Sequence, residues 1–232
     1  MKVLKNKYFY EFLIFLFYIL FFLSLCLTGN FKVFVKKFYF PYILIGTLIL
    51  FFLLVINFKA FKKFKEISVY EIISFIIFLF PMIIFLIVRP TTLPTYAALK
   101  RGIKTEFLSQ DILKSLQEKI EIEGKYKKLT IKQILAFSKS KPDEINEKDV
   151  LVEGMVYKGE EKNKFTLIRF LITCCAVDAT CLGVEVEYEN TKEFKNEDWV
   201  KVKGKAKVEN GKVKIYAINI EKINPPSDPY LY

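Results

Sequence analysis

The pattern of hydrophobic positions divides the chain into three parts. Long apolar runs, broken by only a few charged residues, fill the first 90 residues. Residues 91–149 mix short apolar stretches with charged ones, and from Val150 onward apolar and polar positions alternate. A long apolar run is typical of a membrane helix, and alternation is typical of a half-buried strand. The pattern therefore predicts a transmembrane domain, a connector and a small C-terminal β-domain.

Three apolar runs in the first part are about as long as a bilayer is thick. The third contains Pro81, which predicts a kink, and it ends at Arg89–Pro90. We expect these runs to be three transmembrane helices: Tyr8–Leu27, Phe40–Phe58 and Tyr70–Val88.

Charged residues avoid the middle of all three runs. Glu11 and Glu71 lie near the ends of the first and third runs. Ion paths and proton relays need ionisable groups inside the bilayer. Three helices without such groups predict an anchor or a docking surface, and they do not by themselves predict a pore.

The net charge of +11 belongs mainly to the apolar part of the chain. Residues 1–90 carry 11 Lys and Arg against 3 Asp and Glu, whereas residues 150–232 carry 13 of each. Lysines that flank apolar runs are typical of membrane proteins, and a neutral C-terminal domain does not favour nucleic acid as a partner. We expect a multi-pass protein of the cell membrane. The Lys and Arg residues near the membrane are equally divided between its two sides, so they do not set the orientation. The first helix often dominates orientation, and its lysines favour a cytoplasmic N-terminus and therefore an extracytoplasmic C-terminal domain.

The connector contains signals for two short helices. Ser109 can cap a helix that runs to about Ile122, with Gly124 just after it. Thr130 can cap a second helix that runs to about Ser138. We expect both to be amphipathic and to pack on the C-terminal domain or on the membrane surface.

The last part, residues 150–232, contains five alternating segments. Asn210–Gly211 between the last two is a strong hairpin signal, and Gly154 and Gly204 would permit sharp bends in their strands. Five strands in this length predict an OB-like β-barrel, with a small open β-sandwich as the alternative. The predicted strands are Val150–Val156, Phe165–Thr173, Leu182–Tyr188, Trp199–Val208 and Lys212–Ile223.

Three of the four cysteines lie between the second and third predicted strands, together with Asp178. The chain has no histidine, so histidine catalysis and histidine metal sites are excluded. One interpretation is a site for a soft metal such as zinc or Cu(I), held by Cys174, Cys175, Asp178 and Cys181. Adjacent residues of a strand point to opposite faces, so Cys174 and Cys175 could share an ion only if the strand ended there.

Three other interpretations of this stretch stay open. The cysteines could form a disulfide, either between neighbours or between Cys181 and one of the pair. One of them could be a redox-active or ligand-capturing thiol. They could also be small core residues, with Asp178 capping a turn and Arg169 paired to it.

Several segments together resemble one family of bacterial membrane proteins. The Arg169–Phe170 pair and the Cys174–Ala179 run are the most specific part of this resemblance. The others are Arg89–Leu93, Arg101–Gly102 and Pro225–Tyr232. In this combination the chain resembles the YcgQ-like family, whose members are described as permease subunits. The resemblance implies a few membrane helices, a soluble C-terminal domain and a multi-spanning permease as partner.

These observations favour a membrane-anchored accessory subunit of a permease complex, whose β-domain handles or gates the substrate. The alternative is a membrane-tethered OB-type module that binds a ligand or a thiol-bound metal independently of transport. An enzyme is not expected. The sequence has no Cys-x-x-Cys, no phosphate-binding loop and no nucleophile elbow.

Overall fold

The computed structural model describes residues 6–60, 63–87, 92–105, 116–117, 119–159, 161 and 163–232. The chain separates into two compact units, Met1–Thr91 and Thr92–Tyr232. The first is helical and the second is built around a β-barrel.

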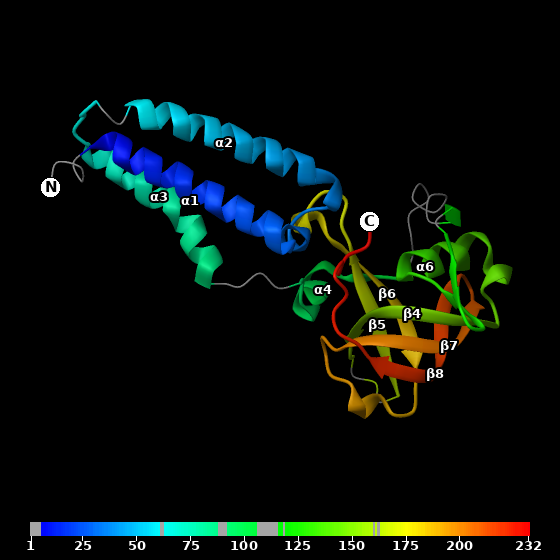
Figure 1. Ribbon diagram of the computed structural model, residues 1–232. Helices are drawn as coiled ribbons and strands as arrows, with labels where there is room; N and C mark the ends of the chain where they lie inside the picture. The colour runs from blue at the N-terminus through cyan, green and yellow to red at the C-terminus, as the bar shows by residue number, and fades with distance from the viewer. Residues whose placement is uncertain are drawn as a thin grey trace. The chain divides into compact units, whose positions relative to one another are not determined.

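Three long helices make up the first unit (Figure 1): α1 (Lys7–Thr28), α2 (Phe40–Ala60) and α3 (Val69–Ile87). Gly29 ends α1 because its φ of 71° suits a residue without a side chain. The 3-10 turns η2 (Asn30–Val33) and η3 (Lys37–Tyr39) lead into α2. These bounds agree with the predicted spans to within a few residues. Val88, the predicted end of the third span, lies outside the described residues.

Among the described residues, two helices are long and apolar enough to cross a membrane, Lys7–Thr28 and Lys37–Ala60. Helix α3 has a shorter apolar part, Val69–Phe85, so the third span stays a prediction. Helix α1 packs against both α2 and α3. Aromatic rings join α1 to α3, with Phe21 and Phe85 edge to face at 4.7 Å between centroids. The Tyr18 hydroxyl donates to the Phe78 carbonyl at 2.7 Å.

Five strands close the barrel of the second unit. Strand β4 pairs with β5, β5 with β6, β6 in parallel with β8, β8 with β7, and β7 returns to β4. This is the closed strand order that the OB-like prediction requires. The strands are β4 (Lys148–Tyr157), β5 (Lys164–Leu171), β6 (Thr180–Glu187), β7 (Trp199–Glu209) and β8 (Lys212–Lys222).

The predicted connector contributes structure to this unit. Its elements are α4 (Thr95–Arg101), β1 (Ile103–Lys104), β2 (Glu121–Glu123), β3 (Tyr126–Lys128) and α6 (Ile131–Ser140). Strand β1 adds to β6, and β3 adds to β4. The helix predicted from Ser109 to Ile122 is wrong at its end, because Glu121–Glu123 pairs with β3 as a hairpin strand. Its start lies outside the described residues.

Helix α6 confirms the second predicted helix. The Thr130 hydroxyl accepts from the Gln133 N–H at 3.1 Å, and the Gln133 side chain accepts from the Thr130 N–H at 2.8 Å, which is a capping box. The helix packs against β4, β5, β6 and β8 and so covers one end of the barrel (Figure 1). Its Ile131, Ile134 and Leu135 join the barrel's interior side chains in the main core.

Gly204 is required by the close approach of β7 and β8. The register shifts by one residue at Lys203/Gly204, which is a β-bulge. A Cβ at Gly204 would clash with the Tyr216 carbonyl oxygen. A side chain is therefore excluded, as expected for a glycine that permits a bend in a small barrel.

A second core cluster lies beside the main one. It combines Ala98 of α4 and Tyr230 near the C-terminus with barrel residues that include Phe170 and Trp199. Trp199 is buried, with 7% of its surface exposed. The connector and the C-terminal segment therefore help to build this part of the core. Ala98 lies well before the first barrel strand in sequence, whereas Tyr230 follows shortly after the last one.

Candidate functional site

Strand β5 ends at Leu171, before the paired cysteines, and a compact turn follows that we call the cysteine loop (residues 173–179). Its internal anchor is Asp178. The two carboxylate oxygens accept from the N–H groups of Thr173 at 3.0 Å and Cys174 at 2.7 Å. Asp178 therefore caps the turn, as one interpretation of the sequence predicted. Strand β5 has ended before Cys174, although the backbone of Cys175 is itself extended. The Sγ atoms of the two cysteines lie 3.7 Å apart.

Arg101, the last residue of α4, holds the cysteine loop from outside. One guanidinium nitrogen of Arg101 lies within hydrogen-bond reach of three carbonyl oxygens of the loop. They belong to Ala176 at 3.2 Å, Val177 at 3.3 Å and Ala179 at 2.8 Å. Hydrogen bonds from a charged donor are stronger than neutral ones. The loop is thus fixed by one cation from the connector and by one carboxylate of its own.

The electrostatics of the loop disfavour a reactive nucleophile. A hydrogen bond to the Asp178 carboxylate, with a smaller effect from Cys175, raises the pKa of the Cys174 thiol to about 11. Burial alone would raise the pKa of Asp178, but hydrogen bonds from Cys174 and from loop N–H groups hold it below its ordinary value. Thiol nucleophiles work as thiolates. A Cys174 that stays protonated at neutral pH does not favour the redox-active interpretation.

Cys181 is separated from the other two cysteines of this stretch. It lies in β6 with no exposed surface, within the second core cluster, and burial raises the pKa of its thiol to about 12. The core interpretation therefore holds for Cys181. All four cysteines of the chain are free thiols.

Of the predicted metal ligands, the structure brings together Cys174, Cys175 and Asp178, but it leaves Cys181 in the core. In the part of the chain that the structure describes, no group of three or more Cys, Asp or Glu side chains is arranged to hold a metal ion. The four-ligand metal site thus gains no support from the geometry and stays a prediction.

Arg169 does not pair with Asp178, so the predicted clamp between them is wrong. Its guanidinium donates to the backbone carbonyls of Asp228 at 2.6 Å and Pro229 at 3.2 Å. It also lies over the ring of Trp199. The Asp178 carboxylate accepts from N–H groups of its own loop instead. Burial lowers the pKa of Arg169 from its ordinary value.

The C-terminal segment, residues 225–232, lies along the end of β5. The Leu231 N–H donates to the Phe170 carbonyl at 2.8 Å, and the Ile172 N–H donates to the Leu231 carbonyl at 3.0 Å. The Lys132 ammonium of α6 donates to the Tyr232 carbonyl oxygen at 2.7 Å. The Tyr230 hydroxyl accepts from the Leu93 N–H at 3.2 Å. The segment therefore connects β5, α6 and the start of the connector.

The segments that carry the family resemblance meet in one region of the second unit. Leu93 contacts the C-terminal segment, Arg101 holds the cysteine loop, and Arg169 holds the C-terminal segment. Arg89, Pro90 and Thr91 lie outside the described residues. The sequence indicated these segments, but it did not predict that they lie together around the C-terminal end of β5.

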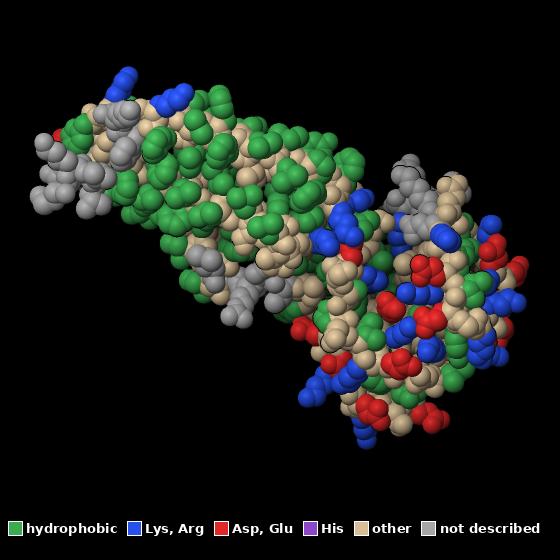
Figure 2. Space-filling model, viewed as in Figure 1, with side chains coloured by type: hydrophobic (Ala, Val, Ile, Leu, Met, Phe, Trp, Pro, Cys, Tyr) green, Lys and Arg blue, Asp and Glu red, His purple; other side chains and the backbone are tan. Residues whose placement is uncertain are grey.

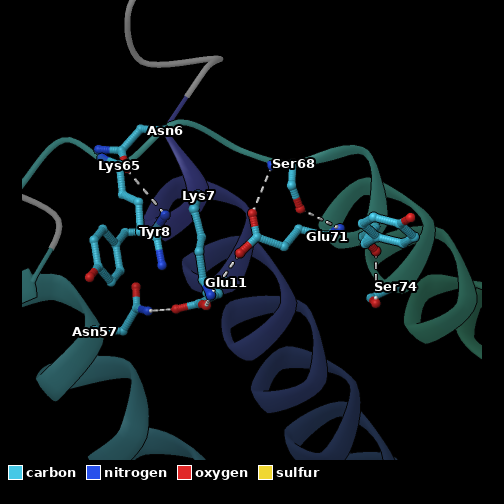
Figure 3. A network of polar contacts seen from close by, with 10 residues as sticks. Asn6, Lys7, Tyr8, Glu11, Asn57, Lys65, Ser68, Glu71 and Ser74 are labelled. Carbon is cyan, nitrogen blue, oxygen red and sulfur yellow. Dashed lines mark hydrogen bonds and ion pairs between the residues drawn. The ribbon is translucent and has the colours of Figure 1, made fainter.

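A second polar cluster, which the sequence did not predict, lies at one end of the helical unit (Figure 3). The Lys7 ammonium lies 2.8 Å from a Glu71 oxygen and 3.4 Å from a Glu11 oxygen. The Asn57 amide of α2 donates to Glu11 at 2.6 Å. Ser68 caps α3, because its hydroxyl accepts from the Glu71 N–H at 3.3 Å, and the Glu71 carboxylate accepts in turn from the Ser68 N–H at 2.8 Å. Lys7, Glu11 and Glu71 lie near the starts of α1 and α3, and Asn57 lies near the end of α2. Because α2 runs antiparallel to its neighbours, these helix ends lie at the same end of the unit.

Comparisons with known proteins place the second unit in a family. Residues 108–232, more than half of the chain, match the model of the DUF1980 C-terminal domain. The UPF0703 protein YcgQ of Bacillus subtilis (strain 168) is 30% identical over 101 residues. That match covers 39% of this chain and 35% of the relative, so it spans about a third of the relative's length.

A similar solved structure is OBody AM1L10 bound to hen egg-white lysozyme, at 22% identity and a TM-score of 0.25. The match covers 35% of this chain and 84% of that chain. The OB-like fold stated above rests on the strand pairing and does not depend on this likeness. The extent of the family match decides the classification: the chain belongs to the DUF1980 C-terminal domain family, and it is a YcgQ-like protein.

Proposed function

We propose that this chain is a membrane-anchored accessory subunit of a permease complex, in which the barrel unit handles or gates the substrate. The observation that carries the proposal is the surface of the helical unit. Apolar side chains cover its visible face, whereas the barrel unit carries mixed charges (Figure 2). On α2 alone the exposed apolar residues include Leu44, Ile45, Leu48, Ile49, Phe51, Phe52, Val55 and Ile56.

Several polar groups of the helical unit pair with one another. Lys7, Glu11, Asn57 and Glu71 form the network at one end of the helices. Between α1, η2 and α3 lies a groove of about 410 Å³ lined by apolar and aromatic side chains, with Tyr18 contributing the one hydroxyl. A path for charged or polar solutes needs a polar lining. If this protein serves transport, a partner must therefore supply the path.

Gly46 in α2 is the residue best placed to receive a partner helix. Nothing lies within 4 Å of the position that a Cβ would occupy there, so the glycine is not explained by packing within the chain. Small residues let membrane helices approach closely. In this proposal α2 docks on a multi-spanning permease along the face of Gly46, and the chain itself catalyses no reaction.

A pull-down from native membranes in a mild detergent tests the partnership. The parent chain should recover a multi-spanning membrane protein. Gly46→Leu should lose it while folding normally, because the site has room for the larger side chain within this chain. Phe52→Leu, which alters a residue that is 64% exposed on the same helix, is the matched control. Recovery of this chain alone at every detergent strength would contradict the proposal.

We also propose that the barrel unit is extracytoplasmic, which follows from three spans and a cytoplasmic N-terminus. An alkaline phosphatase reporter fused after Tyr232 should then be active, because this enzyme matures only outside the cytoplasm. An inactive phosphatase, together with a fluorescent cytoplasmic reporter at the same position, would reverse the orientation.

The second candidate function is a membrane-tethered OB-type module that binds a ligand independently of transport. A groove of about 530 Å³ favours this function, and it lies where the pairing of β6 with β8 ends, at Glu187 and Tyr216. The groove is lined by Asn163, Glu187, Tyr188, Glu189, Asn190, Tyr216, Ala217 and Ile218. Two carboxylates and two tyrosines suit a neutral or cationic ligand, such as an oligosaccharide, better than a nucleic acid. Failure of the pull-down would make this the better candidate.

A further inference from the structure

We propose that Cys174 and Cys175 form a two-thiol binding site for a soft metal cation, with Zn²⁺ as the ion that the spacing fits. The proposal goes beyond the accessory-subunit function and does not depend on a permease partner. It also differs from the four-ligand site predicted from the sequence, because Cys181 takes no part in it.

The first support is the backbone. Neighbouring residues in a strand point to opposite faces, which would keep two adjacent thiols apart. Here β5 ends at Leu171, and the chain turns into the 3-10 segment Ala176–Asp178 directly after Cys175. Cys175 itself has an extended backbone, with φ of −150° and ψ of 170°, but the pair lies beyond the end of β5 and is not held in that strand.

The second support is the distance between the two sulfur atoms. Zinc binds thiolates at about 2.3 Å and prefers tetrahedral coordination, which puts two sulfur ligands about 3.8 Å apart. The Cys174 and Cys175 Sγ atoms lie 3.7 Å apart. An ion can thus be bound by both sulfurs with little movement of either side chain.

The third support is the charge and rigidity of the surroundings. The Asp178 carboxylate lies next to the Cys174 thiol and caps the loop. A carboxylate at this distance disfavours a bare thiolate but attracts a cation. Arg101 and Asp178 hold the loop backbone, so little conformational entropy is lost when an ion binds.

The proposed site is accessible to solvent and leaves coordination positions of the ion free. Cys174 and Cys175 are each partly exposed, and Cys181 is enclosed in the core. Binding replaces the two S–H protons by two S–Zn bonds and releases both protons to solvent. Water or an outside ligand completes the tetrahedron. A site with two ligands from the chain suits an exchangeable ion better than a structural one.

The test uses the full-length, reduced protein in detergent, loaded with Zn²⁺ and dialysed. Elemental analysis should give about one zinc per chain. Zinc should slow alkylation of Cys174 and Cys175 by N-ethylmaleimide at least about tenfold, as followed by peptide mass spectrometry. Cys174→Ser combined with Cys175→Ser should remove the zinc.

Three further variants make the result decisive. Cys26→Ser and Cys181→Ala should keep the zinc, whereas Asp178→Asn should weaken its retention. The fluorescence of Trp199, the single tryptophan, reports whether each variant is folded. The proposal is overturned if the reduced parent retains no zinc or if the double variant retains as much as the parent. It is also overturned if a folded Cys181→Ala variant loses the ion.

Discussion

The guanidinium carbon of Arg169 lies 5.6 Å from the centre of the Trp199 ring, which joins β5 to the start of β7. A cation over an aromatic face is a favourable contact, and it gains strength when both groups are buried. The same guanidinium holds the carbonyls of Asp228 and Pro229. One side chain thus links the barrel, the second core cluster and the C-terminal segment.

Replacing Arg169 by Lys should reduce the free energy of unfolding by about 2 kcal/mol. Lysine keeps the charge but has no planar fork, so it cannot serve both carbonyls and cover the Trp199 ring at once. Urea unfolding monitored by Trp199 fluorescence measures the loss. Lys207→Met removes a cation from an exposed ion pair with Glu209 and should leave the midpoint unchanged. Equal midpoints for Arg169→Lys and the parent would count against this role of Arg169.

Replacing Gly204 by Ala should reduce stability by about 2 kcal/mol, because the new methyl group meets the Tyr216 carbonyl and the backbone of β8 must move. Gly159→Ala is the matched control, since nothing lies within 4 Å of its Cβ position. The same urea titration gives both values. If the two variants unfold together, the approach of β7 to β8 is looser than the structure indicates.

The rate of Cys174 alkylation should rise with pH along a curve centred at about 11 rather than at the ordinary thiol value of 9.0. Asp178→Asn removes the largest cause of the shift, so its curve should move to lower pH and its rate at pH 8 should increase. Tandem mass spectrometry assigns the modified residue, and glutathione in the same tube gives the ordinary thiol rate. A curve that Asp178→Asn leaves in place would show that the carboxylate does not control this thiol.

Replacing Asn57 by Ala should weaken the packing of α2 on α1 by about 1 kcal/mol. The change removes the hydrogen bond to Glu11 and leaves a carboxylate oxygen without that donor. Ser74→Ala is the control, because the Ser74 hydroxyl donates to the Tyr70 carbonyl within its own helix. Loss of helical circular dichroism during titration with a denaturing detergent measures the difference. Coincident curves for the two variants would rule out a stabilising role of the network.

Much of this fold could be predicted from the sequence, because the signals are local. A run of twenty apolar residues is a helix wherever it lies, and alternation over eight residues is a strand. The five barrel strands, the capping role of Thr130 and the turn at Asn210–Gly211 all follow from neighbours in sequence. In this turn both residues have a positive φ.

Tertiary structure alone decided where the separated polar groups meet. Arg169 and Asp178 are nine positions apart, yet Arg169 binds carbonyls some sixty positions away, because the C-terminal segment closes over the end of β5. Arg101 reaches the cysteine loop only because β1 pairs with β6. Cys181 is close to Cys175 in sequence but enters the core, because pairing with Phe170 makes it part of a buried strand. Periodicity reports only on residues close together in sequence. These contacts depend on how distant segments pair their backbone N–H and carbonyl groups in the folded chain.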